Sequence, residues 1–311
     1  MRIVAALGGN ALLERGDKPD AAIQHRHIRR AAQALAPLAL DHELIICHGN
    51  GPQIGMLSLE SEADQALSAP YPLDVLGAQT QGMIGYWLAQ ELRNAGVAFP
   101  VVSIITQTVV DAADPSFALP TKFIGPVYAK HHAQRLAHRH GWTVAPDGAH
   151  WRRVVPSPQP DRIVELASIR LLTDQNTVVV CGGGGGAPVV ETETGELLGV
   201  EAVVDKDLTS ALLACELRAD LLMLLTDVPA VMRDFGTDQA RPIQAIDLAG
   251  LDGLSFPAGS MGPKIEACSR FVRLTGRSAA IGALTDTAGI LAGTAGTTIR
   301  SGTLATNASI S

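Results

Sequence analysis

The sequence predicts an α/β fold in which helices cover both faces of a mostly parallel β-sheet. Short apolar runs rich in Val, Ile and Leu alternate with longer helical patterns along the 311 residues. This alternation is typical of buried parallel strands joined by helices. The composition agrees, since 47% of the residues are hydrophobic, 4% are aromatic and 31 are glycines. Ligands of such a sheet bind above the carboxyl ends of its strands.

Three of the expected strands end in glycine-rich turns. The strand at residues 2–7 runs into Gly8, Gly9 and Asn10, the strand at 45–47 into an HGNGPQ segment with Gly49, Asn50 and Gly51, and the strand at 178–181 into five glycines at 182–186. Glycine has no Cβ atom, so its backbone N–H groups can surround an anion closely. Each turn alone could be an ordinary connection, but three of them indicate loops that converge on one charged ligand.

The other elements of the first 110 residues follow from periodicity. Helices are expected at residues 20–40, shortened or kinked by Pro37, and at 73–96, with strands at 43–47 and 101–106. Small residues in the second helix predict close packing against another element or a second subunit. A solvated face is predicted for the polar cluster of the first helix, which consists of His25, Arg26, His27, Arg29 and Arg30.

Residues 111–160 form short segments separated by prolines, with little strand character and one helix at 128–140. This pattern predicts a small cap inserted between elements of the main sheet. The cap carries the PTKFIGP motif with Lys122 and the WRRVVPSP motif at 151–158. It also holds His131, His132, His138 and His140, which raise the question of a metal site. Because His138 and His140 are two residues apart on a helix, they face different ways, and a hydrated surface is predicted.

The chain beyond the cap continues the α/β pattern. A helix at 161–173 leads to the third strand and its glycines, and a hairpin is expected around Gly195. A helix opens in VVDKD at Lys206 and runs to about 217, and a strand at 221–225 ends at Thr226 and Asp227. The GSMGPK motif with Lys264 opens the next helix, and a last strand is expected at 279–284.

Several classes of protein are disfavoured by composition. A net charge of −7 argues against nucleic acid as a partner, since such proteins present a basic face. The sequence contains no apolar stretch of membrane-spanning length and no signal-peptide pattern. The cysteines at 47, 181, 215 and 268 show no metal-ligand spacing and are expected to be buried free thiols. We expect a cytoplasmic protein.

Two common phosphate-binding motifs do not account for the glycines. The sequence has no G-x-x-x-x-G-K-[ST] segment, which excludes a Walker-type site. Gly182, Gly184 and Ala187 match the G-x-G-x-x-A pattern of dinucleotide-binding proteins. However, Pro188 and a strand-like segment follow, where that fingerprint requires a helix.

Lys122, Lys206 and Lys264 lie close to glycine turns or helix starts. Each could be a surface lysine, and Asp207 beside Lys206 could be a simple helix N-cap. Together with the glycine loops, however, they supply what phosphoryl transfer needs, which is positioning and fixed positive charge. An acceptor that is already an anion would need no general base.

The motifs LGGNALL, HGNGPQ, TQGMIGYW, PTKFIGP, WRRVVPSP, CGGGGGAPVV, GVEAVVDKD, TDVPAV and GSMGPKIEA occur in this order. They closely resemble the carbamate kinases of the amino-acid kinase superfamily over nearly the whole chain. The resemblance implies a three-layer αβα sandwich with an open, mostly parallel central sheet (the amino-acid kinase fold), and a homodimer. It implies reversible phosphoryl transfer between ATP and carbamate, with Mg²⁺ carried by the nucleotide. We expect ATP synthesis in arginine or purine catabolism; the alternatives are another small-carboxylate or phosphate kinase of the superfamily and a catalytically silent nucleotide sensor.

The resemblance also implies a role for individual residues. Residues 1–218, including the cap at 111–160, would bind carbamate, and residues 219–311 would bind the nucleotide. Catalysis would fall to Lys122, Lys206 and Asp207. The substrate site would comprise Gly8, Gly9, Asn10, Gly49, Asn50, Gly51, Gly183 and Gly184. The nucleotide site would comprise Thr226, Asp227, Met261 and Lys264.

The sequence departs from the family pattern at three places. Phe123 replaces the first proline of the cap motif, the glycine run is one residue longer, and Ala258 stands where proline is common. The first two could shift Lys122 or the substrate loop. They bear on the identity of the substrate more than on the type of reaction.

Overall fold

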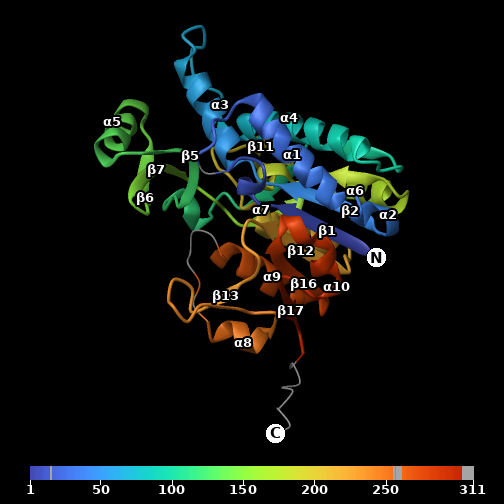
Figure 1. Cartoon of the computed structure of the whole chain (residues 1–311). Helices are drawn as coiled ribbons and strands as arrows, with labels where there is room; N and C mark the ends of the chain where they lie inside the picture. Colours follow the sequence, from blue (N-terminus) through green and yellow to red (C-terminus); the bar gives the residue numbers. More distant parts are fainter. Residues whose placement is uncertain (15, 255, 257–260, 303–311) are drawn as a thin grey trace.

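An eight-stranded sheet forms the centre of the computed structural model, which describes residues 1–14, 16–254, 256 and 261–302 (Figure 1). The strand order is β15–β17–β16–β12–β1–β2–β9–β3. Neighbouring strands run parallel except β16 and β17, which are antiparallel. In sheet order, the bounds are Ala245–Asp247, Thr297–Arg300, Ser278–Ala283, Leu221–Thr226, Arg2–Leu7, Glu43–His48, Val178–Val180 and Val101–Ser103.

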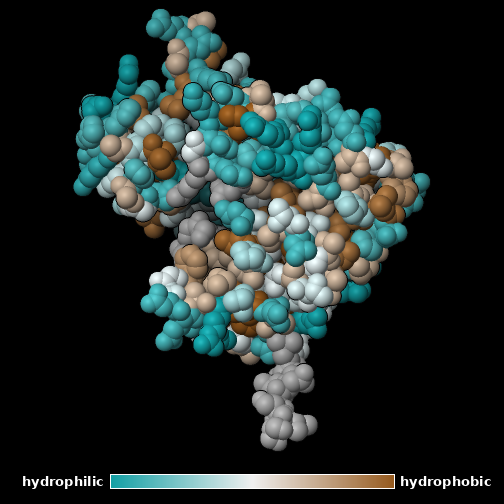
Figure 2. Space-filling model, viewed as in Figure 1, coloured by the Kyte–Doolittle hydropathy of each residue, from teal (hydrophilic) through white to brown (hydrophobic). Residues whose placement is uncertain are grey.

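Helices cover both faces of this sheet, as predicted. One layer consists of α1 (Ala21–Leu35), α2 (Leu38–Asp41), α4 (Leu73–Asn94) and α10 (Thr287–Ala292). The other consists of α6 (Leu166–Asp174), α7 (Lys206–Glu216), α8 (Leu248–Asp252) and α9 (Met261–Thr275). Side chains of β1 alternate between the two cores, with Ile3 in one and Val4 in the other. Figure 2 shows mostly hydrophilic residues over α1 and α4 of the first layer.

A second sheet in the order β11–β10–β4–β8 lies beside the main one. Its strands are β4 (Gln107–Val110), β8 (Pro160–Ile163), β10 (Ala187–Glu191) and β11 (Leu197–Gly199). The expected hairpin around Gly195 is present, since β10 and β11 pair antiparallel. The helix expected at 161–173 was wrong in its first part, because residues 160–163 pair with β4 as a strand.

A separate three-stranded unit occupies residues 122–155 and lies to one side of the molecule (Figure 1). It contains β5 (Lys122–Tyr128), α5 (Lys130–His140), β6 (Thr143–Asp147) and β7 (His150–Val155). The expectation of little strand character was wrong here. Pro126 falls at an irregularity in the β5–β7 pairing, and Pro146 lies in the edge strand β6, where proline is tolerated.

The remaining elements connect these parts. Pro37 separates α1 from α2, as expected, and the strand expected at 101–106 ends at Ser103. The others are η1 (Gly9–Ala11), α3 (Gly51–Ala63), η2 (Pro115–Phe117), η3 (Gly183–Gly185), β13 (Met232–Arg233), β14 (Arg241–Pro242) and η4 (Leu284–Asp286). Within the described part of the chain, no helix combines the length and apolarity that crossing a membrane requires.

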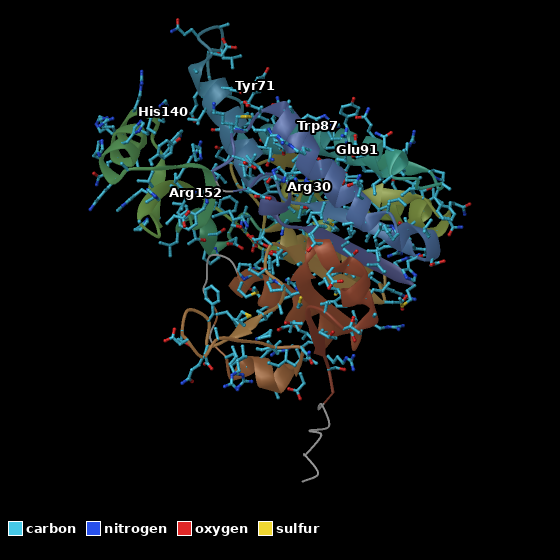
Figure 3. The ribbon with its side chains drawn as sticks, viewed as in Figure 1. Arg30, Tyr71, Trp87, Glu91, His140 and Arg152 are labelled. Atoms are coloured by element: carbon cyan, nitrogen blue, oxygen red, sulfur yellow. The ribbon has the colours of Figure 1, made fainter. Side chains whose placement is uncertain are left out.

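The polar cluster of α1 is only partly a solvated face. His25 Nε2 lies 3.2 Å and Arg29 Nε 3.1 Å from the carboxylate of Glu91, which is buried on α4. His27 is buried and its Nε2 lies 2.8 Å from Asp17 Oδ2. Glu91 and Trp87 are labelled on this side of the molecule in Figure 3. These contacts join α1 to α4 and to the preceding loop.

The close packing predicted for α4 occurs within the chain. A Cβ atom added to Gly85 would lie 1.9 Å from Ser103 Oγ, so α4 rests directly on β3 at this glycine.

Candidate active site

The three glycine turns meet at one edge of the sheet, as the sequence predicted. Strands β1, β2 and β9 are neighbours and run parallel, so their carboxyl ends lie together. The Gly8 N–H donates to Leu225 O at 2.9 Å, and the Gly49 N–H donates to Leu7 O at 3.0 Å. A Cβ atom on Gly49 would lie only 3.0 Å from Gly9 N and 3.4 Å from Lys206 Cε. The first two turns and Lys206 therefore border the same space.

The third turn is a tightly packed glycine loop. Gly184 has a φ of +63°, a left-handed conformation that L side chains rarely adopt. A Cβ atom there would lie 2.1 Å from Nδ2 of Asn50, which donates to Thr80 Oγ1 at 2.9 Å. The Gly185 carbonyl accepts from Thr108 Oγ1 at 2.8 Å and from Thr209 Oγ1 at 2.9 Å. The loop thus packs against the second turn without room for side chains.

Lys206 and Lys264 share one carboxylate. Lys206 Nζ lies 2.6 Å from Asp207 Oδ1, and Lys264 Nζ lies 3.0 Å from Asp207 Oδ2. The side chains of Lys206 and Lys264 are 10% and 13% exposed, so neither is a surface lysine. The contact joins α7, which follows the second sheet, to α9 of the C-terminal part. Sequence alone did not show that Lys264 reaches Asp207.

The charges of this cluster determine its pKa shifts. Burial acts to raise the pKa of Asp207, but the two ammonium groups outweigh it and hold that pKa far below its usual range. Burial lowers the pKa of Lys206, and the nearby Lys264 adds to the effect against the attraction of Asp207. For Lys264, burial acts to lower the pKa, but the contact with Asp207 prevails and raises it. Asp207 is therefore a carboxylate that orients two cations.

Lys122 reaches the same region from the three-stranded unit. Its ammonium group forms an ion pair with Asp205 Oδ2. The other oxygen of Asp205 accepts from the N–H groups of Asp207, at 2.8 Å, and Leu208, at 3.3 Å. Asp205 is thus the N-cap of α7, and the N-cap interpretation of Asp207 was wrong. A single carboxylate links the start of α7 to Lys122.

The other predicted residues lie around this centre. Gly51 begins α3, Asn10 lies in η1, and Met261 begins α9 one turn before Lys264. Thr226 ends β12 beside Gly8, and its Oγ1 donates to Asp227 Oδ1 at 3.0 Å. The Arg152 guanidinium lies over the Phe123 ring, with its carbon 5.7 Å from the ring centre. Ala258 and the neighbouring residues 259–260 of the GSMGPK motif lie outside the described residues.

Two residues of the site were missed by sequence reasoning. Asp205 was visible as the first acidic residue of VVDKD, two before Asp207, where a helix N-cap is expected. His48 precedes Gly49 and is buried, with its Nδ1 3.0 Å from Gly49 O. Burial lowers the pKa of His48 to about 4, so its ring is neutral at pH 7. Apart from its place in HGNGPQ, nothing in the sequence indicated that His48 would be buried against this loop.

The donor groups bear on how a metal could enter. Among the described residues, no three His, Cys, Asp or Glu side chains come close enough together to hold a metal ion. The histidines of α5 are among the residues to which this applies. Mg²⁺ usually binds through substrate phosphates and water with only one or two carboxylates. Asp205 and Asp207, the two carboxylates at the start of α7, are both paired with lysines.

Comparison with known proteins assigns the family. Residues 1–282 match the sequence pattern of the amino acid kinase family. The chain belongs to the amino acid kinase family. A carbamate kinase of Rhizobium meliloti (strain 1021) is 51% identical over 304 residues, which cover 97% of this chain and 94% of that protein. The resemblance inferred from the motifs is confirmed.

Solved structures agree with the fold. The carbamate kinase from Giardia lamblia bound to citric acid superimposes with a TM-score of 0.91 at 37% identity, over 97% of this chain and 98% of that one. The same enzyme bound to AMP-PNP gives a TM-score of 0.87 at 36% identity, over 97% and 98% of the two chains. The described glycine loops and lysines thus belong to an amino acid kinase fold. The strand β10 follows the glycines, where a dinucleotide-binding fold would have a helix.

Proposed function

We propose that this amino acid kinase is a carbamate kinase that transfers a phosphoryl group reversibly between ATP and carbamate. The observation that carries the proposal is the convergence of three glycine turns and three lysines on one edge of the sheet. The relatives named carbamate kinase, which match nearly the whole chain at 44–51% identity, support the choice of substrate.

The proposed reaction requires no general base. A carbamate oxygen carries negative charge and attacks the γ-phosphorus directly, while the bond from that phosphorus to the β,γ-bridging oxygen breaks and ADP leaves. In the reverse direction, a β-phosphate oxygen of ADP attacks the phosphorus of carbamoyl phosphate, the bond from that phosphorus to the carbamate oxygen breaks, and carbamate leaves. The loose transition state places negative charge on the three equatorial oxygens of the migrating group. Fixed positive charge around those oxygens lowers the barrier.

We assign that charge to the lysines and the glycine turns. Lys206 borders the space between Gly9 and Gly49, so its ammonium is assigned to the migrating phosphoryl group. Lys264, on α9, is assigned to the nucleotide phosphates, and Lys122 to the phosphoryl group from the opposite side. Asp207 orients Lys206 and Lys264, and Asp205 orients Lys122. The backbone N–H groups of Gly9 and Gly184 would bind the acyl phosphate oxygens, since those of Gly8 and Gly49 donate to Leu225 O and Leu7 O.

Mg²⁺ is assigned to the nucleotide phosphates. Both oxygens of Asp207 are taken by lysines, so phosphates and water would hold most of the ion's coordination sphere. When bound, the ion neutralises part of the phosphate charge. Asn10, Asn50 and Gly51 complete the proposed carbamate site, while Thr226, Asp227 and Met261 complete the proposed nucleotide site. We assign carbamate to residues 1–218 and the nucleotide to residues 219–311.

A coupled assay tests the proposal. Purified protein is incubated with ADP, Mg²⁺ and carbamoyl phosphate, and ATP is measured by hexokinase and glucose-6-phosphate dehydrogenase. We expect ATP formation that depends on all three components, and lower rates with acetyl phosphate, in which a methyl group replaces the amino group. Activity with another acyl phosphate but not with carbamoyl phosphate would favour a different kinase of this family. No activity with any phosphoryl donor would favour a nucleotide-sensing protein.

The biological setting is also part of the proposal. We infer a cytoplasmic homodimer that works towards ATP synthesis, in arginine or purine catabolism. Sedimentation of the purified protein at several concentrations tests the dimer, and a monomer at all concentrations would contradict it. Growth of a deletion strain on arginine or on purines as the energy source tests the direction and the pathway.

A further inference from the structure

Helix α3 connects the proposed substrate site to the three-stranded unit. It begins at Gly51, directly after the second glycine turn, and ends at Ala63. Gly55, Ser58 and Glu62 are spaced by three and four residues, so they lie on one face of the helix. All three contact the three-stranded unit. This face of α3 therefore holds the unit that carries Lys122.

The first contact is a close approach of two backbones. A Cβ atom added to Gly55 would lie 2.0 Å from Gly125 Cα and 2.3 Å from Gly125 N. Gly125 lies in β5, three residues after Lys122. No other residue type fits at position 55 without moving β5. The position of the Lys122 backbone therefore depends on the absence of a side chain in α3.

The second contact is a partly buried polar cluster, which we call the α3 anchor and define as Ser58, Glu62, His140, Trp142 and Arg153. Arg153 Nη1 donates to Ser58 Oγ at 2.7 Å and to Glu62 Oε1 at 3.3 Å. Trp142 Nε1 donates to Glu62 Oε1 at 3.1 Å, and His140 Nδ1 lies 3.0 Å from Glu62 Oε2. The Arg153 guanidinium lies 4.7 Å from the centre of the Trp142 ring.

The ion pair at the centre of the α3 anchor is largely shielded from water. The side chains of Glu62 and Arg153 are 10% and 14% exposed. A hydrogen-bonded ion pair that is shielded from water is costly to break, because separation leaves an unpaired buried charge. His140 was expected on a hydrated surface, but it stacks on Trp142 with ring centres 5.0 Å apart and faces Glu62. Figure 3 shows His140 and Arg152 in the three-stranded unit, beside α3.

The pairing of β5 with β7 links the position of Arg153 to that of Lys122. In the antiparallel pair of β5 and β7, Ile124 is opposite Arg153 and Lys122 is opposite Val155. Arg153 thus fixes β7, and the β7–β5 pairing fixes the strand from which Lys122 extends to Asp205. Neither Arg153 nor Glu62 belongs to the proposed phosphate site. Their effect on the reaction has to pass through the placement of the strand.

We propose that Arg153 and Glu62 are positioning residues for Lys122: through the α3 anchor they hold β5 on the same helix that begins at the substrate turn. This inference rests on the proposed role of Lys122 in phosphoryl transfer. It assigns a function to the second arginine of WRRVVPSP, which the sequence analysis left without one. The anchor sets the distance between Lys122 and the glycine turns.

Kinetics with a matched control test this proposal. Arg153→Met and Glu62→Gln are each expected to lower kcat for ATP formation from carbamoyl phosphate by about 10- to 100-fold, because small displacements of a reacting group are costly. The KM for ADP is expected to stay within about threefold of the wild-type value. The control is Arg162→Met, since Arg162 forms an exposed ion pair with Glu191 in the second sheet. It is expected to leave kcat within about threefold of the wild-type value.

A double variant, Arg153→Met combined with Lys122→Ala, shows whether Arg153 affects kcat through Lys122 or through a wider disturbance of the structure. If Arg153 acts through Lys122, adding Arg153→Met to Lys122→Ala should change kcat by less than about twofold. A further tenfold loss on top of Lys122→Ala would overturn the proposal, as would a wild-type kcat for Arg153→Met alone.

A steric variant tests the same strand position without removing a charge. Gly55→Ala favours the helix but places a Cβ atom against β5, and it is expected to lower kcat to a similar degree as Arg153→Met. Gly82→Ala in α4, where an added Cβ meets nothing within 4 Å, is the control and should not lower kcat. Equal kcat values for Gly55→Ala and wild type would count against the proposal.

Amide hydrogen exchange makes the test independent of the assigned reaction. Arg153→Met and Gly55→Ala are expected to raise exchange at residues 122–128 by about tenfold over wild type, while β1 and β12 stay protected. If wild-type protein made no ATP from carbamoyl phosphate, the proposed function would fail, yet this exchange pattern would still support the anchoring of β5. Unchanged exchange at 122–128 in both variants would overturn the anchoring itself.

Discussion

Lys264 Nζ lies 3.0 Å from Asp207 Oδ2 and thereby joins α9 to the first turn of α7. The other oxygen of Asp207 holds Lys206 at 2.6 Å. One buried carboxylate thus fixes two ammonium groups that come from parts of the chain 58 residues apart. Their separation and direction are set before any substrate enters, which is what electrostatic catalysis requires.

Replacing Asp207 should damage both activity and stability. In Asp207→Asn the two lysines lose their shared counter-charge, and we expect kcat to fall by about 10²- to 10³-fold. Without nucleotide, the free energy of unfolding should fall by about 3 kcal/mol, because two buried ammonium groups are left unneutralised. Asp252→Asn is the control, since its pair with Arg273 is exposed and is worth under about 1 kcal/mol. Urea unfolding that gave equal losses for both variants would contradict this account of Asp207.

Removing Lys122 should affect turnover more than nucleotide binding. Lys122 reaches the site from the three-stranded unit, whereas the nucleotide is assigned to the C-terminal part. In Lys122→Ala we expect kcat to fall by about 10²- to 10³-fold. The Kd for ADP, measured by calorimetry, should change by less than about threefold. A parallel loss in kcat and ADP affinity would mean that Lys122 binds the nucleotide ground state.

A single methyl group in the glycine run should be poorly tolerated. Gly184→Ala forces a left-handed alanine and drives its Cβ atom into the buried amide of Asn50. We expect a loss of about 2–4 kcal/mol in unfolding free energy from the two effects together. Gly293→Ala has a similar φ of +74° but open space for its Cβ, so only about 1 kcal/mol should be lost. Similar losses in thermal or urea unfolding for the two variants would argue against tight packing at Asn50.

The stability of the protein should depend on pH through His48. The folded protein keeps this buried ring neutral down to about pH 4, whereas the unfolded chain binds a proton near pH 6.5. Unfolding therefore takes up a proton between these values, and stability falls as the pH falls. Between pH 7.5 and 4.5 we expect His48 to account for a loss of about 2–3 kcal/mol.

His48→Gln removes the titrating group and gives the comparison. Its urea-unfolding free energy should decline less between pH 7.5 and 4.5 than that of the wild type. Changing the exposed His131 in the same way should leave the wild-type decline intact. A His48→Gln curve parallel to the wild-type curve would show that His48 does not titrate in this range.

Much of the main sheet could be predicted because its signals are local. The apolar run at 2–7 and the glycine turn at 8–10 predicted a buried strand followed by a tight turn. In the structure, β1 lies between β2 and β12 and pairs with both. The prolines of residues 111–160 misled the strand prediction. Pro126 and Pro146 lie at a strand irregularity and in an edge strand, and only the pairing of β5, β6 and β7 reveals those places.

The residues proposed for the candidate site could be named from the sequence, but the contacts between them could not. Lys206 and Lys264 were recognised from their positions near helix starts, yet their common partner Asp207 depends on how α7 packs against α9. Asp205 was overlooked because its two oxygens serve different elements, the start of α7 and Lys122. His140 was placed on a hydrated surface because its partner Glu62 is 78 positions away and comes close only through the α3 anchor.

The most direct test of the central claim compares wild type with Lys206→Met by ³¹P NMR in the presence of ADP, Mg²⁺ and carbamoyl phosphate. We predict that the wild-type sample gains the γ-phosphate signal of ATP as the carbamoyl phosphate signal is lost. Lys206→Met should form ATP about 10²- to 10³-fold more slowly while remaining folded. A wild-type sample without ATP, or a Lys206→Met sample that makes ATP at the wild-type rate, would contradict it.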